Sequence, residues 1–216
     1  MHRKIVIPSL LLSLLCACVD DTKYLMTSLN DSSGAPVEAP WPAARYTSHA
    51  APAAATEIIP VRVAGPFTPY DRAKILRAVN EWNVALNGFA RFDILPEGAP
   101  AVAGKSYAAP WMIVAVQGNG ARAASGVATA LAHTYGEQAS GGLMTVYLDR
   151  LGRRDLGGVV MHELGHALGL GHDNSGGLMA ARYHPSSQNC VDKTTIQAVA
   201  AKRGLQVDRL NWCRPG

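Results

Sequence analysis

The sequence predicts an α+β fold, in which one twisted mixed sheet carries helices. Three observations support this class. A strand-like run at residues 58–63 is followed by an amphipathic helix that begins near residue 69, several further strand-like segments come next, and a second, apolar helix follows Asp155. Segments in this order bury their apolar sides against one another in a layered domain.

The first 17 residues have the form of an export signal. His2, Arg3 and Lys4 precede the apolar run Ile5 to Leu15, which is too short to span a bilayer but fits the core of a signal peptide. The run ends in Leu15-Cys16-Ala17-Cys18, which resembles the bacterial lipobox and predicts lipidation of Cys18. We therefore expect a lipoprotein anchored to a membrane of the cell envelope, facing the periplasm or the exterior. The alternative is an ordinary signal peptide and a secreted protein.

Residues 18–56 are predicted to form a flexible tether, because they hold Pro36, Pro40, Pro42 and Pro52 among many small residues and show little periodicity. The remaining residues, 57–216, form the predicted domain. The chain has 20 basic and 16 acidic residues, and 18 against 16 once Arg3 and Lys4 are removed with the signal. This weak positive charge disfavours nucleic acid as a partner, and we expect a monomer.

Local signals place the first elements of the domain. Residues 58–63 read as a strand, and Pro60 suggests an edge strand or a strand start. Thr68 suits the N-cap of the following helix, with Pro69 in the first turn, Asp71 in the acidic position of a capping box and Gly88 just past the end. Further strands are expected at 89–95, 111–116, 127–134 and 143–148, with a turn at the glycine pair 141–142.

The sequence His162-Glu163-Leu164-Gly165-His166 places two imidazoles four residues apart. On a helix, such residues lie on the same face and can bind one metal ion, and Glu163 can address a water molecule on that metal. His172 supplies a third imidazole if the chain leaves the helix sharply, and Gly169 stands where that turn is needed. Three imidazoles with one open position are the composition of a catalytic zinc site.

Met179 follows seven residues after the third histidine. A methionine is most often core filler, but next to this cluster we expect a tight turn that places its thioether beneath the site. The whole pattern, HExxHxxGxxH followed by a methionine turn, resembles the signature of the metzincin zinc peptidases. Leu178-Met179-Ala180-Ala181-Arg182-Tyr183 is similar to the LMxPxY of the matrixin branch, although Ala181 replaces the proline and Asp173 stands where matrixins commonly have serine.

The resemblance implies a metzincin-like domain with an edge substrate strand, an active-site helix, a methionine turn and a C-terminal helix starting near Cys190. It implies a zinc endopeptidase in which Glu163 acts as general base on a zinc-activated water. A protein or peptide substrate would lie along Ala130, Leu131 and Ala132, and Tyr183 would help to wall the pocket for the next side chain. We assign one catalytic zinc ion. His133 lacks partners for a structural zinc, and no calcium-binding loop is visible.

Two other functions stay open: a non-catalytic peptide-binding protein on a peptidase scaffold, and a zinc hydrolase of a non-peptide substrate. The former class usually loses the glutamate or a histidine, which this chain keeps. Two cysteines, Cys190 and Cys213, remain beyond the signal. Because an exported protein sits in an oxidising compartment, we expect a disulfide between them.

Overall fold

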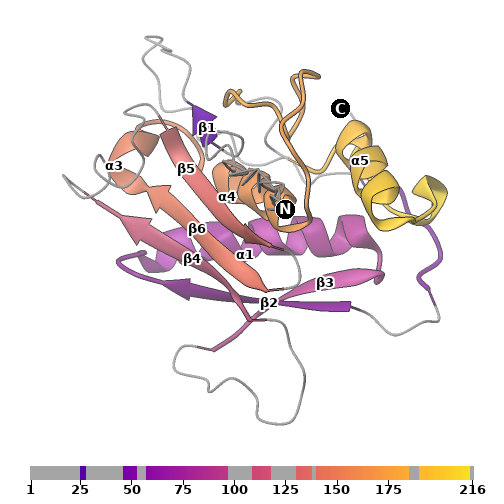
Figure 1. Ribbon diagram of the computed structural model, residues 1–216, viewed down its shortest axis with the longest axis horizontal. Coiled ribbons are helices and arrows are strands. Elements are labelled where there is room, and N and C mark those ends of the chain that lie inside the picture. Colours follow the sequence, from indigo (N-terminus) through magenta and orange to yellow (C-terminus); the bar gives the residue numbers. More distant parts are fainter. Residues whose placement is uncertain are drawn as a thin grey trace, which may run out of the picture.

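The computed structural model describes residues 25–27, 46–52, 57–96, 109–117, 130–137, 140–184 and 190–214, and residues 25–27 by their backbone alone. Its centre is a six-stranded sheet with the strand order β1-β5-β6-β4-β2-β3, shown in Figure 1. The strands are β1 (Leu25–Thr27), β2 (Glu57–Ala64), β3 (Ala90–Ile94), β4 (Trp111–Val116), β5 (Ala130–Glu137) and β6 (Gly141–Tyr147). The helices are α1 (Pro69–Leu86), α3 (Leu148–Leu151), α4 (Leu156–Ala167) and α5 (Lys193–Arg203), with a 3-10 turn at Val207–Arg209.

The sheet is mixed, and this confirms the predicted α+β class. β2 runs parallel to β3 and β4, and β4 runs parallel to β6. β5 is antiparallel to β6, and β1 is antiparallel to β5. α1 makes the crossover that lets β2 and β3 run parallel.

The signals at both ends of α1 act as the sequence predicts. The hydroxyl of Thr68 accepts a hydrogen bond from the backbone N–H of Asp71, whose carboxylate accepts one from the N–H of Thr68. This capping box satisfies two groups that the helix itself leaves unpaired. At the other end, Asn87 and then Gly88 take positive φ values of 48° and 84°, which ends the helix.

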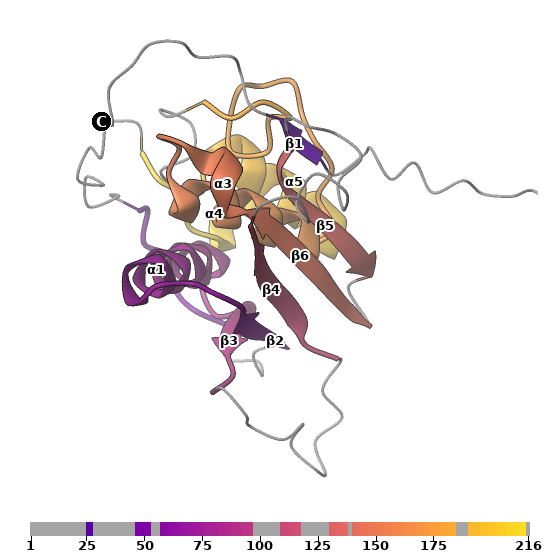
Figure 2. The same cartoon turned by 90° about the vertical axis from the view of Figure 1, so that its left-hand side faces the viewer.

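α1 and α4 pack against each other and cover one face of the sheet, as Figure 2 shows. The apolar side of α1 is buried there. The indole N–H of Trp82 donates a hydrogen bond of 2.8 Å to the carbonyl of Met161 on α4. This bond fixes α4 relative to α1, and α4 carries the first two histidines of the motif.

Two details differ from the expectations. β2 lies between β4 and β3, so it is not an edge strand. Pairing with β4 begins at Val61, and Pro60 therefore lies in the half of β2 that pairs with β3 alone. The predicted glycine turn lies inside β6, because Gly142 pairs with Gly136 and packs so closely on Trp111 that a side chain there would collide.

Part of the predicted tether lies against the domain. Residues 25–27 form β1, and residues 46–52 contact the C-terminal segment, where the N–H of Thr47 donates to the carbonyl of Trp212 at 2.9 Å. Residues 1–24, which include Cys18 and the predicted signal, lie outside the described residues. Within the described residues, no helix has the length and apolar character needed to cross a membrane.

Candidate metal centre

The structure brings the three predicted histidines together. His162 and His166 lie on α4, one turn apart and buried, and His172 reaches them from the segment that follows. The Nε2 atom of His162 is 3.0 Å from that of His166 and 3.2 Å from that of His172. Within the described part of the chain, this is the one group of three or more His, Cys, Asp or Glu side chains that could hold a metal ion.

The hydrogen bonds of two rings fix which nitrogen carries the proton. Nδ1 of His162 lies 2.7 Å from the carbonyl of Leu178, and Nδ1 of His166 lies 2.8 Å from that of Leu170. Because a carbonyl oxygen only accepts, both Nδ1 atoms donate, and in the neutral rings both Nε2 atoms carry a lone pair. Burial keeps the rings neutral: it lowers the pKa of His166 to about 3 and that of His162 well below its usual range.

This arrangement fits a zinc ion. Lone pairs that face one another at about 3 Å repel unless a cation lies between them. Two nitrogens bound to one tetrahedral zinc at about 2.05 Å are about 3.3 Å apart, close to the separations observed. Carbonyl partners on Nδ1 also match the usual environment of metal-bound histidines. The residues present therefore suit zinc, held by three imidazoles with a fourth position open.

The turn after α4 places His172. Gly169 has φ of 84°, its N–H donates to the carbonyl of His166, and the N–H of Leu170 donates to that of Gly165. These two bonds make a Schellman motif, which ends the helix and reverses the chain. The same turn brings the carbonyl of Leu170 back to Nδ1 of His166. Gly169 thus serves both the third ligand and the orientation of the second.

The predicted methionine turn is present at residues 177–180, where the N–H of Ala180 donates to the carbonyl of Gly177. Met179 is buried directly against Gly165, on the stretch of α4 between the two histidines. The preceding residue, Leu178, supplies the carbonyl that orients His162. The turn therefore supports the site in two ways: Met179 packs against α4, and the carbonyl of Leu178 orients the ring of His162.

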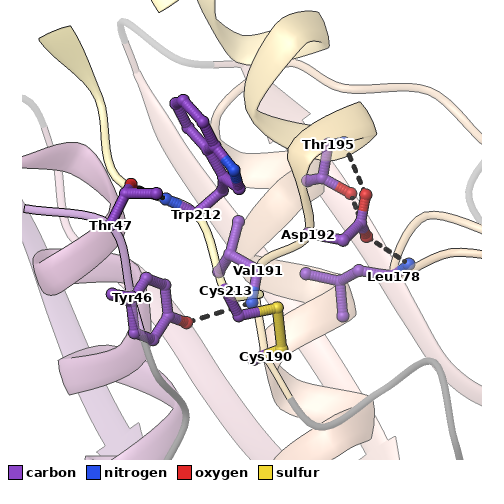
Figure 3. The surroundings of a disulfide bond; sticks show 9 residues. All are labelled: Tyr46, Thr47, Leu178, Cys190, Val191, Asp192, Thr195, Trp212 and Cys213. Atoms are coloured by element: carbon purple, nitrogen blue, oxygen red, sulfur yellow. Dashed lines mark hydrogen bonds between the residues drawn. A yellow bond between two sulfur atoms is a disulfide. The ribbon is translucent and has the colours of Figure 1, made fainter. Parts of the chain in front are cut away.

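Asp192, the N-cap of α5, holds this turn in place, as Figure 3 shows. One carboxylate oxygen accepts from the N–H of Leu178 at 3.0 Å, and the other accepts from the N–H of Thr195 at 2.9 Å. The adjacent disulfide between Cys190 and Cys213 joins the start of α5 to the C-terminal segment, with their Cα atoms 6.0 Å apart. The structure thus forms the predicted bridge. Cys190 is two residues before Asp192, which contacts the methionine turn.

Glu163 is fully buried beside the histidines in the chain, and its two oxygens have different surroundings. Oε2 accepts a short hydrogen bond from the hydroxyl of Thr134 on β5, whereas Oε1 is buried without a partner among the described residues. Burial raises the pKa of Glu163 to about 8, and the bond from Thr134 opposes this rise. A cation on the histidines would lower the pKa, because opposite charge favours the carboxylate.

The residues of the predicted substrate pocket occupy different places. Ala130, Leu131 and Ala132 lie in β5 and are buried, and the outer edge of this strand is paired with β1 through Thr27↔Ala130 and Met26↔Ala132. Tyr183 is buried, and its hydroxyl accepts a hydrogen bond from the N–H of Asp155, the N-cap of α4.

An open cavity of about 520 Å³ adjoins the segment after His172. It is lined by Asp173, Asn174, Gly176, Ala180, Ala181, Arg182 and His184. Asp173, which departs from the matrixin pattern, accepts bonds from the N–H and the hydroxyl of Ser175 and so shapes the rim of this cavity. Tyr183 does not line this cavity, and its role in the substrate pocket stays a prediction.

Sequence reasoning missed three residues of the site. The sequence predicts Thr134 only as part of a strand, and the roles of Leu170 and Asp192 depend on contacts that no local pattern reveals. Only Asp192 has a local signal: it stands just before the last helix, and Asp is a favoured N-cap residue. His133 is half-buried on β5 and close enough to lower the pKa of His166 further.

Comparisons with known proteins agree with the motif. Residues 115–201 match the matrixin family model, and this span includes β5, β6, α4 and the methionine turn. A comparison with curated proteins found no match. The match to the family model confirms the predicted resemblance to metzincin zinc peptidases.

Three solved structures are similar to parts of the chain. High choriolytic enzyme 1, a hatching-enzyme zinc protease from Oryzias latipes, is 22% identical over 53% of this chain and 44% of its own, with a TM-score of 0.31. Myroilysin is 22% identical over 53% and 48%, with a TM-score of 0.33. Archaemetzincin from Methanopyrus kandleri is 15% identical over 70% and 97%, with a TM-score of 0.42. The chain thus spans about half the length of the first two.

Proposed function

We propose that this metzincin-like protein is a zinc-dependent endopeptidase. The proposal rests on the convergence of the Nε2 atoms of three histidines. In two of these rings, a carbonyl bonded to Nδ1 leaves the lone pair on Nε2. The next residue in the chain after His162 is Glu163, a buried carboxylate with one unpartnered oxygen. A structural zinc site is normally closed by four protein ligands, whereas three histidines leave a position for reaction.

His162, His166 and His172 would hold the zinc, which when bound activates a water molecule and polarises the carbonyl of the substrate. Glu163 is the general base. Its Oε1 takes a proton from the attacking water as the water oxygen bonds to the carbonyl carbon. It then gives that proton to the amide nitrogen as the C–N bond breaks, so one carboxylate serves both steps.

The outer edge of β5 is the proposed site for the substrate backbone. An extended peptide that pairs with Ala130 to Ala132 gains main-chain hydrogen bonds whatever its side chains are, which suits cleavage within a chain. The cavity beside Asp173 and Arg182 would take a side chain next to the scissile bond. Because β1 pairs with the same edge, a substrate bound there must replace residues 25–27.

Glu163→Gln is the test of this function, because it keeps the shape of the side chain and removes the base. Wild-type protein, loaded with zinc, should cleave internal bonds in a library of peptides with blocked ends. The variant should retain zinc and lose about 10²–10⁴-fold in kcat. Glu137→Gln, at the exposed end of β5, is the matched control and should cleave normally.

Two outcomes would contradict the proposal. If the variant cleaved at the wild-type rate, Glu163 would not be the base. If the wild-type protein held zinc but cleaved no peptide, a binding protein or a hydrolase of another substrate would be the better account.

We propose further that the protein is exported and anchored to a membrane through a lipid on Cys18. The lipobox-like Leu15-Cys16-Ala17-Cys18 supports this placement, and so does a disulfide, which persists in an oxidising compartment.

A further inference from the structure

Thr134 touches the carboxylate that the proposed mechanism uses. It lies on β5 between His133 and Tyr135, and its side chain points to the face of the sheet that α4 covers. Thr134 is 3% exposed and Glu163 is 0% exposed, so water does not compete for their hydrogen bond. The contact joins the strand that would bind the substrate to α4, which carries two of the three candidate metal ligands.

The hydrogen bond makes the two carboxylate oxygens different. The hydroxyl has one proton and donates it to Oε2. A carboxylate held at one oxygen cannot rotate freely about its terminal torsion, so the other oxygen, Oε1, stays in one place. Oε1 is one of three buried side-chain nitrogen or oxygen atoms without a partner in the described part of the chain.

An unpartnered buried acceptor is costly, at about 1–3 kcal/mol, and native structures contain few. Glu163 directly follows His162 in the chain, and an unpartnered atom on a residue next to a candidate metal ligand indicates a partner that the protein chain does not supply. In the proposed mechanism that partner is the attacking water, which donates to Oε1.

We propose that Thr134 is a positioning residue for the reaction: its hydroxyl holds Oε2 of Glu163 so that Oε1 is the oxygen that takes the proton from water. This role rests on the proposed peptidase function. Thr134 itself touches neither water nor substrate in this role. It acts through Glu163, and the hydroxyl rather than the β-branched shape of the side chain is what the role requires.

Two substitutions separate the hydroxyl from the shape. Thr134→Val keeps the branched side chain and removes the donor, whereas Thr134→Ser keeps the donor and removes a methyl group. Hydrogen bonds to charged groups are stronger than those between neutral groups, and losing this one should leave Oε1 poorly positioned. We therefore expect Thr134→Val to lower kcat by about tenfold or more. KM should change less than about twofold, and zinc content should match the wild type. The thermal midpoint should fall in Thr134→Val, because Oε2 of Glu163 then lacks its hydrogen-bond partner. Thr134→Ser should recover most of kcat.

Thr145→Val is the matched control, because Thr145 lies on the neighbouring strand β6 opposite His133 and is half-buried. It should leave kcat unchanged. The role of Thr134 would be overturned if Thr134→Val kept the wild-type kcat. It would also be overturned if the Val and Ser variants lost activity equally, together with zinc or thermal stability, because the threonine would then serve packing alone.

The same experiment distinguishes this role from the function beneath it. If the wild-type protein cleaves no peptide, the proposed function is contradicted and the role of Thr134 is contradicted with it. If the wild type is active and Thr134→Val is equally active, the function stands and only the role of Thr134 is contradicted.

Discussion

At the scale of single residues, Gly165 shows how closely the motif is packed. It lies on α4 between His162 and His166, and a Cβ built on it would overlap the sulfur of Met179 and touch the ring of Trp82 at 3.4 Å. The absence of a side chain lets the methionine turn approach the helix. The conformation of Gly165 is helical, so space and not backbone freedom explains the glycine.

We therefore predict that Gly165→Ala destabilises the protein by about 1–3 kcal/mol, the usual cost of overpacking a core. In an open helix the same change would stabilise by up to about 1 kcal/mol, so the sign of the effect identifies the cause. Thermal unfolding with bound zinc measures it. Gly171→Ala is the control, because a Cβ there meets nothing within 4 Å. A Gly165→Ala protein more stable than the wild type would refute this packing.

At the level of helices and strands, the sequence predicts those features that depend on contacts between neighbouring residues. The capping box at Thr68, the start of a helix after Asp155 and the turn at Gly169 each depend on a few neighbouring residues, and the structure has all three. The histidine spacing likewise needs only a helix and a turn. Contacts between distant segments were not predictable in this way: Thr134 with Glu163, Asp192 with Leu178, and β1 with β5 join residues that only the packed sheet brings together.

The pairing of β1 with β5 leads to a prediction about substrate binding. Residues 25–27 and an extended substrate would compete for one strand edge, so weakening β1 should strengthen substrate binding. Met26→Pro removes a backbone N–H and disfavours pairing with Ala132. In the full chain we expect a lower KM and an unchanged kcat for peptide cleavage. Glu137→Gln, at the exposed end of β5, is the control and should keep the wild-type KM. A Met26→Pro protein with the same KM as this control would show that β1 does not compete with substrate.

In the molecule as a whole, the C-terminal segment contacts residues 46–49, α1 and the residues just before α5. Cys213 bridges to Cys190 and pairs with Tyr46, while Asn211 accepts from the N–H of His49 and donates to the carbonyl of Val84 on α1. The hydroxyl of Tyr46 accepts from the N–H of Val191, just before α5. The disulfide thus fixes a junction between the N-terminal segment, α1 and the support of the methionine turn.

Intact-mass measurement tests this junction together with the proposed anchor. The mature protein should begin at Cys18, carry acyl mass and take up no thiol label until it is reduced. Reduction should lower the free energy of unfolding by roughly 3 kcal/mol, because the bridge closes a loop between residues 23 positions apart. An unacylated chain with two reactive thiols in the native state would contradict both the anchor and the bridge.

In the proposed function, three histidines hold a zinc ion on which peptide hydrolysis depends. The most direct measurement is to titrate metal-depleted protein with zinc while peptide cleavage is followed. Activity should rise linearly and level off at about one equivalent of zinc, and His172→Ala should stay inactive over the same range because one of its ligands is missing. Full activity in the metal-depleted protein, or a His172→Ala titration identical to that of the wild type, would contradict a catalytic zinc held by these histidines.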